Sequence, residues 1–210
     1  MGLGADNPAF KIKKYPEKRK DRFLQMDEIW RLQDALNAAE LQKTETRDVI
    51  ACFRFSLLTG LRCGEVLNLV WSEIDVTAKT IKFQYSKTGP RTVPLNDQAW
   101  EVILQHREIK DSGYVIKSAT GEGRPALGKP WYRIRKQADT SETANIHCLR
   151  HTFASWAIMG DLSLAQTGAL LGHKSTQTTL RYADHLTEVV REYSQKTANQ
   201  FMVDRTHRNQ

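Results

Sequence analysis

Cysteine is scarce in this chain and long apolar runs are absent, which excludes two structural classes at the start. The three cysteines, Cys52, Cys63 and Cys148, are odd in number and lie in apolar helical contexts, which disfavours a disulfide framework and fits a reducing cytosol. No Cys-x-x-Cys pair suggests zinc. No run of about eighteen apolar residues occurs, and the amino-terminal residues are polar and then basic, unlike a secretory signal. We therefore expect a soluble, intracellular protein without a membrane span.

Positive charge is in excess, because 31 Lys and Arg residues against 24 Asp and Glu give a formal net charge of +7. Such a charge attracts an acidic partner over about 8 to 10 Å at physiological salt. Nucleic acid is the commonest acidic partner, but a modest positive charge also serves solubility, so composition leaves both interpretations open.

Part of this charge is concentrated in residues 1–22, which have the composition of a flexible basic linker. A solvated tail and a strap that contacts DNA phosphates are equally good interpretations of this segment by itself. Its basic residues are Lys11, Lys13, Lys14, Lys18, Arg19, Lys20 and Arg22.

Hydrophobic spacing divides the chain into helices around one short β-rich region. Alternating residues predict a small three-stranded antiparallel sheet with strands at 73–76, 80–85 and 91–95. We therefore predict one domain that is mainly α with a small sheet, large enough to bury roughly 70% of its unfolded surface. Helices are predicted from Met26, over 46–58, over 61–69 after a break at Thr59-Gly60, after a cap at Asn96, and over 127–139, 147–159, 162–171, 175–181 and 186–203.

Residues 59–65 place an arginine just after a turn and near a helix start, where backbone N–H groups point towards any bound anion. Arg62 is therefore a candidate phosphate ligand. A surface ion pair with Glu65, three residues on, is an equally good interpretation of this segment. We assign Glu65 itself to structure, bonding nearby backbone or His147.

His147 and Arg150 are three residues apart, a spacing that places both on one face of a helix. Arginine presents a planar fork that matches two phosphate oxygens, and histidine exchanges a proton near neutral pH. A metal site formed by His147, His151 and His173 is the alternative, but the glutamate that metalloproteases carry after the first histidine is missing. The spacing favours an anion site.

The segment Leu-Gly-His ends another predicted helix, and Gly172 suits a left-handed cap that would expose His173. Tyr182 follows nine residues later, after a short predicted helix. With a pKa near 10, a tyrosine hydroxyl needs help with deprotonation and a stabilised transition state to act as a nucleophile. A lone tyrosine is usually half-buried packing, so Tyr182 gains interest only together with its neighbours.

The order Arg62, His147-x-x-Arg150, Leu-Gly-His173 and Tyr182 closely resembles the tyrosine recombinase family, the phage-type integrases. The resemblance covers residues 23–203 and includes the phrases Thr-Gly-Leu-Arg-x-Gly-Glu, Leu-Arg-His-Thr-Phe-Ala-Ser and Leu-Gly-His. It implies the tyrosine recombinase catalytic-domain fold. It also implies that the two arginines clamp the scissile phosphate, that the two histidines complete the pocket, and that the tyrosine is the nucleophile.

Lys87 follows from the resemblance by its position on the turn after the second strand, where the family carries a mobile lysine; Lys79 and Lys82 fit that turn less well. The implied activity is site-specific DNA recombination, in integration or excision, through a 3′-phosphotyrosine. The implied chemistry needs no metal, ATP or other cofactor. Asp184 and His185 either orient the nucleophile or lie at the surface.

The resemblance also implies a domain organisation and partners. Residues 1–22 correspond to a linker from an amino-terminal core-binding domain outside this sequence, 23–185 to the catalytic domain, and 186–210 to a carboxy-terminal helix and tail. The partners would be double-stranded DNA and other protomers in a tetrameric synapse on DNA, with room for accessory DNA-bending proteins. The expected location is the cytoplasm of a bacterial host cell.

Two other functions remain open at this level. A type IB topoisomerase shares the tyrosine chemistry but relaxes supercoils as a monomer, and the integrase-like phrases favour recombination over it. A DNA-binding module that only holds the duplex would form no covalent adduct.

Overall fold

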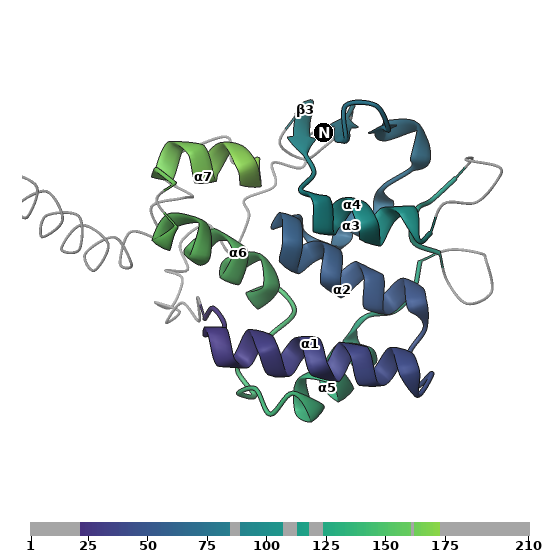
Figure 1. Cartoon of the computed structure of the whole chain (residues 1–210), viewed down its shortest axis with the longest axis vertical. Coiled ribbons are helices and arrows are strands. Elements are labelled where there is room, and N and C mark those ends of the chain that lie inside the picture. The colour runs from purple at the N-terminus through teal and green to yellow at the C-terminus, as the bar shows by residue number, and fades with distance from the viewer. Residues whose placement is uncertain (1–21, 85–88, 107–112, 118–123, 161, 173–210) are drawn as a thin grey trace, which may run out of the picture.

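The computed structural model describes residues 22–84, 89–106, 113–117, 124–160 and 162–172. It confirms the predicted class, mainly α with a small three-stranded antiparallel sheet (Figure 1). In chain order the elements are α1 (Met26–Leu41), α2 (Arg47–Thr59), α3 (Cys63–Asn68), the 3-10 helix η1 (Trp71–Glu73), β1 (Ile74–Asp75), β2 (Thr80–Phe83), β3 (Arg91–Pro94), α4 (Asp97–Leu104), α5 (Gly128–Gln137), α6 (Cys148–Met159) and α7 (Leu164–Leu171).

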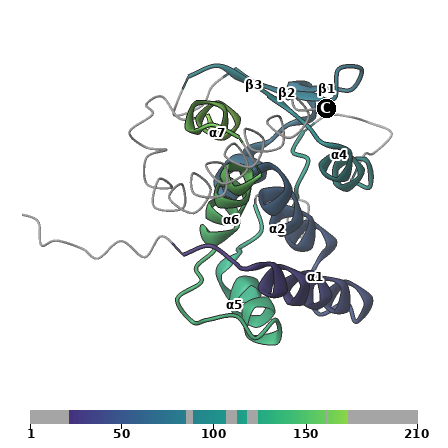
Figure 2. The ribbon, with the colours of Figure 1, turned by 60° about the vertical axis from the view of Figure 1, so that its left-hand side comes forward.

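Helix α2 is the centre of the core and packs against α1, α3, α4 and α6 (Figures 1 and 2). All its residues from Val49 to Leu57 are buried except Arg54, as expected for a helix surrounded by other elements. Thr46 caps its start by accepting a hydrogen bond from the Val49 amide, and Gly60 ends it in the left-handed conformation, with φ of 68°. The break predicted at Gly60 is confirmed.

The sheet has the order β1-β2-β3, with both pairings antiparallel. Ile81 faces Val93 across the β2–β3 pair, and both side chains are buried, whereas Lys82 on the opposite face is exposed. The first strand is shorter than predicted, because Glu73 belongs to η1, where its amide donates to the Val70 carbonyl. The two-residue alternation of apolar and polar side chains correctly identified the strands, but the 3-10 turn at Trp71–Glu73 makes β1 shorter than predicted.

Two helices of the carboxy-terminal half pair to form a second, smaller cluster. Leu171 of α7 packs with Ala154 and Ile158 of α6. A Cβ atom on Gly60 would lie 2.5 Å from Cδ1 of Phe153 and 2.7 Å from Cδ2 of Leu171. The turn after α2 therefore lies directly against α6 and α7, and only glycine allows this approach.

Other predicted helix boundaries are close to the observed ones. The helix after Asn96 is confirmed, with the Asn96 side chain accepting from the Ala99 amide. Helix α7 begins at Leu164, later than predicted, because Ser163 caps it by accepting from the Gln166 amide. The helices predicted over 175–181 and 186–203 lie outside the described residues. Within the described part of the chain, no helix is both long and apolar enough to cross a membrane.

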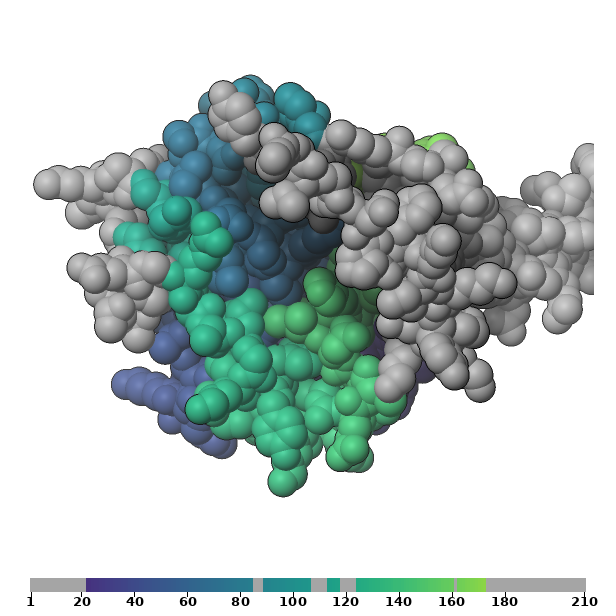
Figure 3. Space-filling view, turned by 180° about the vertical axis from the view of Figure 1, so that it is seen from behind, coloured from purple at the N-terminus to yellow at the C-terminus, as the bar shows by residue number. Residues whose placement is uncertain are grey.

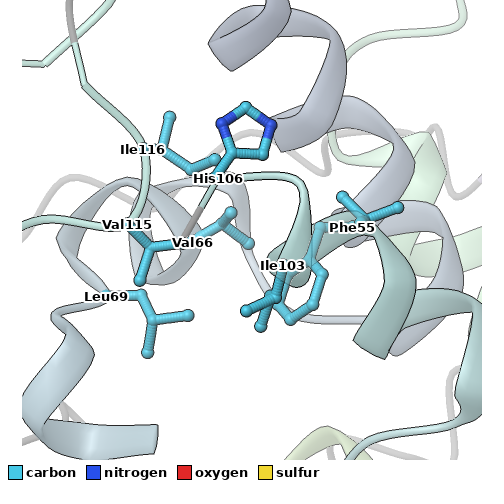
Figure 4. A pocket seen from close by; sticks show the side chains of 8 residues that line it. Phe55, Val66, Leu69, Ile103, His106, Val115 and Ile116 are labelled. Carbon is cyan, nitrogen blue, oxygen red and sulfur yellow. The ribbon is translucent and has the colours of Figure 1, made fainter. Parts of the chain in front are cut away.

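A cavity of about 10 Å³ lies between α2, α3 and α4 (Figure 4). Its lining is apolar apart from His106, and a cavity of this size is at the lower limit for a single water molecule. It is a small packing defect of the core, too small to admit a substrate. The lining residues are Phe55, Val66, Leu69, Val102, Ile103, His106, Val115 and Ile116.

The Gly60 turn yields a prediction about stability. Gly60→Ala should lower the free energy of unfolding by about 1 to 3 kcal/mol, because the new methyl group meets positive φ and two packed side chains. Gly64→Ala is the matched control, since it lies in α3 with open space around its Cβ position, and it should be neutral or stabilise slightly. Urea unfolding followed by circular dichroism measures both, and equal midpoints for the two variants would contradict this account.

The three cysteines are free thiols and are buried, which yields a second prediction. Burial raises the pKa of the Cys148 thiol to about 12. At pH 8 its thiolate is therefore scarce, and iodoacetamide should modify Cys148 at least about 100-fold more slowly in the folded chain than in urea. Mass spectrometry of the Cys148 peptide over time gives both rates, and similar rates would show that the thiol is accessible.

Candidate active site

The guanidinium of Arg150 lies inside the protein, where it joins the ends of two helices. Arg150 is only 6% exposed, and it donates hydrogen bonds to the carbonyl of Gly60 at 2.7 Å and to the carbonyl of Leu171 at 2.9 Å. Gly60 caps α2, and Leu171 is the last residue of α7. Carbonyls at helix carboxyl ends carry partial negative charge, so they compensate a buried cation. Arg150 therefore has a defined orientation.

The carboxylate of Glu65 lies beside three arginines. Its Oε2 accepts from the backbone N–H of Arg62 at 2.9 Å, and its Oε1 accepts from Arg62 Nη1 at 3.2 Å and from Arg91 Nη2 at 2.9 Å. Arg150 Nη1 lies 3.9 Å from Oε2. One negative charge against three positive charges leaves the group positive, which suits an anion. The group Arg62, Glu65, Arg91 and Arg150 is called the arginine cluster below.

The arginine cluster brings together two of the predicted phosphate ligands, Arg62 and Arg150. The side chain of Arg62 is 37% exposed and that of Arg150 is 7% exposed, so one guanidinium is accessible and the other is held within the protein. The alternative interpretation of Arg62, an ion pair with Glu65, is also observed. Glu65 was predicted to bond either nearby backbone or His147, and the backbone bond is observed, because its carboxylate accepts from the Arg62 amide.

His147 is the N-cap residue of α6, three positions before Arg150. Its backbone N–H donates to Oδ1 of Asn145, and its side chain is exposed, whereas that of Arg150 is buried. Helix α6 therefore begins one residue later than predicted, and His147 faces solvent whereas Arg150 faces the core. Figure 3 shows the blue surface around α2 and α3 recessed, with the green surface of the α6 region beside it.

Lys87, His173 and Tyr182 lie outside the described residues, and so do Asp184 and His185. Their predicted roles stay predictions. The described chain does reach Gly172, whose φ of 67° confirms the left-handed cap expected just before His173.

Lys79 and Lys82, which fit the turn after the second strand less well than Lys87, form surface ion pairs. Lys79 Nζ lies 2.9 Å from a carboxylate oxygen of Asp97, and Lys82 Nζ lies 2.7 Å from one of Asp75. Both lysines are therefore engaged at the surface of the sheet.

Arg91 was not predicted as a site residue. It lies on β3 with its side chain 11% exposed, bonded to Glu65 and 5.1 Å from the centre of the Phe83 ring. The sequence contained a signal for it: Arg91 and buried Val93 are two residues apart and therefore share a face of the strand. A charged residue on the core face of a strand implies a buried partner.

No group of three His, Cys, Asp or Glu side chains within the described ranges is arranged to hold a metal ion. The alternative metal site included His173, which lies outside those ranges, so that hypothesis is untested.

Comparison with known proteins places these features in a family. Residues 22–188 match the model of the phage integrase family. The integrase of Salmonella phage P22 is 30% identical over 200 residues, covering 84% of this chain and 48% of that protein.

Solved structures show the same fold. The crystal structure of XerA recombinase superposes with a TM-score of 0.66 at 23% identity, over 86% of this chain and 65% of that one. A post-cleavage complex of XerH site-specific recombinase bound to palindromic difH substrate superposes with a TM-score of 0.66 at 19% identity, over 84% of this chain and 53% of that one.

The chain spans about half the length of the curated relatives it matches, 53% of the tyrosine recombinase XerC of Chlorobaculum parvum and 48% of the P22 integrase. The family match nevertheless covers most of this chain, from Arg22, four residues before α1, to beyond Tyr182. This chain belongs to the phage integrase family, and its described part has the fold of a tyrosine recombinase catalytic domain.

Proposed function

We propose that this chain cuts and rejoins double-stranded DNA in site-specific recombination, in integration or excision, through a covalent 3′-phosphotyrosine at Tyr182. The observation that carries the proposal is the arginine cluster, in which Arg62 and Arg150, far apart in the sequence, meet the same carboxylate. Family membership and the DNA substrate named for the XerH complex support DNA as the partner.

Displacement at a phosphodiester needs three things: an in-line attacking oxygen, neutralised non-bridging oxygens and a proton for the leaving 5′ oxygen. The Tyr182 oxygen attacks phosphorus while the bond to the 5′ oxygen breaks, which gives a 3′-phosphotyrosine and a free 5′ hydroxyl. The hydroxyl of a second strand reverses the step with nearly equal bond energy. The reaction therefore requires no ATP.

The two arginines stabilise the charge on the non-bridging oxygens. Arg150 is oriented by the carbonyls of Gly60 and Leu171, so its position is set before DNA binds. Arg62 presents a more exposed guanidinium, and such forks form paired hydrogen bonds to phosphate oxygens. Together these cations supply the charge that a divalent metal supplies in many nucleases.

Side chains around Arg62 and Arg150 carry out the proton transfers. His147, exposed at the start of α6, assists removal of the Tyr182 proton, an effect worth about 10² to 10⁴ in rate. Lys87 protonates the leaving 5′ oxygen, and His173 adds a further hydrogen bond to the phosphate.

The rest of the chain serves assembly on DNA in this proposal. Residues 1–22, which are rich in lysine and arginine, act as a basic linker that contacts DNA phosphates. Residues 23–185 form the catalytic domain. Residues 186–210 exchange between protomers in a tetramer on DNA, which accessory DNA-bending proteins can assist. The work takes place on DNA in the bacterial host cell.

The covalent step can be tested without knowing the target sequence. A pool of random-sequence duplexes, labelled at the 5′ end and nicked just downstream of the random region, lets the short 5′-hydroxyl product diffuse away and traps the adduct. The label should migrate with the 24.0 kDa protein in a denaturing gel for the parent, and Tyr182→Phe should abolish it. Tyr132→Phe, a change at an exposed tyrosine of α5, is the matched control and should keep it.

The strands captured in that experiment separate the competing functions. A recombinase should enrich a defined sequence, a topoisomerase should capture strands with little sequence preference and relax plasmid DNA, and a binding module should capture nothing. Adduct formation by Tyr182→Phe would refute the assignment of the nucleophile.

The proposed binding of phosphate by Arg62 yields a further prediction. Arg62→Ala should slow adduct formation by about 10² to 10³, because one preorganised donor to the phosphate is lost. Arg31→Ala removes a half-buried arginine of α1 that pairs with Asp27 and donates to the Ala138 carbonyl, away from the arginine cluster, and it should leave the rate unchanged. Rates come from quenched time courses on the captured sequence, and an Arg62→Ala rate equal to that of the control would remove Arg62 from the site.

A further inference from the structure

We infer that Arg91 is a positioning residue of the active site: it holds the end of α7, from which His173 follows, against the arginine cluster. The inference rests on the proposed function and deepens it. In this assignment Arg91 acts on the reaction through His173.

The contacts of Arg91 join segments that are far apart in the sequence. Its Nη2 donates to Glu65 Oε1 at 2.9 Å, and its Nη1 donates to the Gly172 carbonyl at 3.4 Å. The two ends of one planar group thus bond an α3 carboxylate and the carbonyl of the residue just before His173. A fork with fixed geometry sets the distance between the groups that it bridges.

The side chain of Arg91 packs directly against the Cα atom of Gly172, where any other residue would carry a Cβ atom. A Cβ atom on Gly172 would lie 2.6 Å from Cδ of Arg91 and would also collide with its Cζ and Nη1 atoms. The glycine is therefore required twice, for its positive φ and for the close approach of Arg91. The end of α7 and the side chain of Arg91 fit each other closely.

The sheet provides a rigid base for Arg91. Its backbone pairs with Phe83 of β2, and its guanidinium lies 5.1 Å from the centre of the Phe83 ring. The side chain is only 11% exposed. A side chain packed on a paired strand has little freedom, so it transmits the position of the sheet to α7.

A purely stabilising ion pair is the competing explanation, and chemistry separates the two. A lysine at position 91 retains the charge beside Glu65 but has a single nitrogen, so it cannot also hold the Gly172 carbonyl in the same geometry. If Arg91 only neutralises Glu65, a lysine at this position should preserve the cleavage rate. If Arg91 positions α7, the lysine should lower the cleavage rate.

The experiment measures single-turnover cleavage of the DNA sequence captured by the parent chain, over a range of DNA concentrations. Arg91→Lys should lower the maximal rate constant about 10- to 100-fold and leave the half-saturating DNA concentration within about twofold. Arg54→Lys is the matched control, because Arg54 is a partly buried arginine that pairs with Glu40 and bonds Asn37 away from the cluster. It should retain the parent rate.

A double-mutant comparison tests whether Arg91 acts through His173. His173→Ala combined with Arg91→Lys should be as slow as His173→Ala alone, within about twofold, because the positioned group is already gone. Multiplying effects, or a parent-like rate for Arg91→Lys, would overturn the inference while leaving the proposed function in place. A parent chain that forms no adduct would overturn both.

Discussion

The buried guanidinium of Arg150 is the constraint on which the rest of the site depends. A cation with 6% exposure is stable only where fixed partners compensate it, and these partners are the carbonyls of Gly60 and Leu171 and the nearby carboxylate of Glu65. Each partner lies at the end or start of a helix. Holding Arg150 therefore requires α2, α3 and α7 to end and begin at set positions around α6.

Glu65 allows the three arginines of the cluster to lie close together, and it leaves the group with a net positive charge. Without a carboxylate, three neighbouring guanidinium groups would repel one another. With it, the group forms and still keeps a net positive charge towards an anion. The bonds of Glu65 to the Arg62 amide and side chain also connect this balance to the first turn of α3.

The small sheet has a structural role beyond completing the fold. Its inner face contributes Ile81 and Val93 to the core, and Arg91 extends the same face to the cluster. A strand places successive inward side chains at regular intervals, so it can carry a charged group to a defined place beside a helix end. The close contact between Arg91 and Gly172 depends on this geometry.

The sequence by itself determined the local features: the helix and strand periods, the caps at Asn96, Gly60 and Gly172, and the pairing of Arg62 with Glu65. These depend on residues within a few positions of one another, where backbone geometry dictates contacts. Only the tertiary structure decided that Arg150 is buried between two helix ends and that Arg91 joins the cluster. Both depend on packing between segments far apart in the chain, and hydrophobic patterns set which face is buried without setting which polar groups meet there.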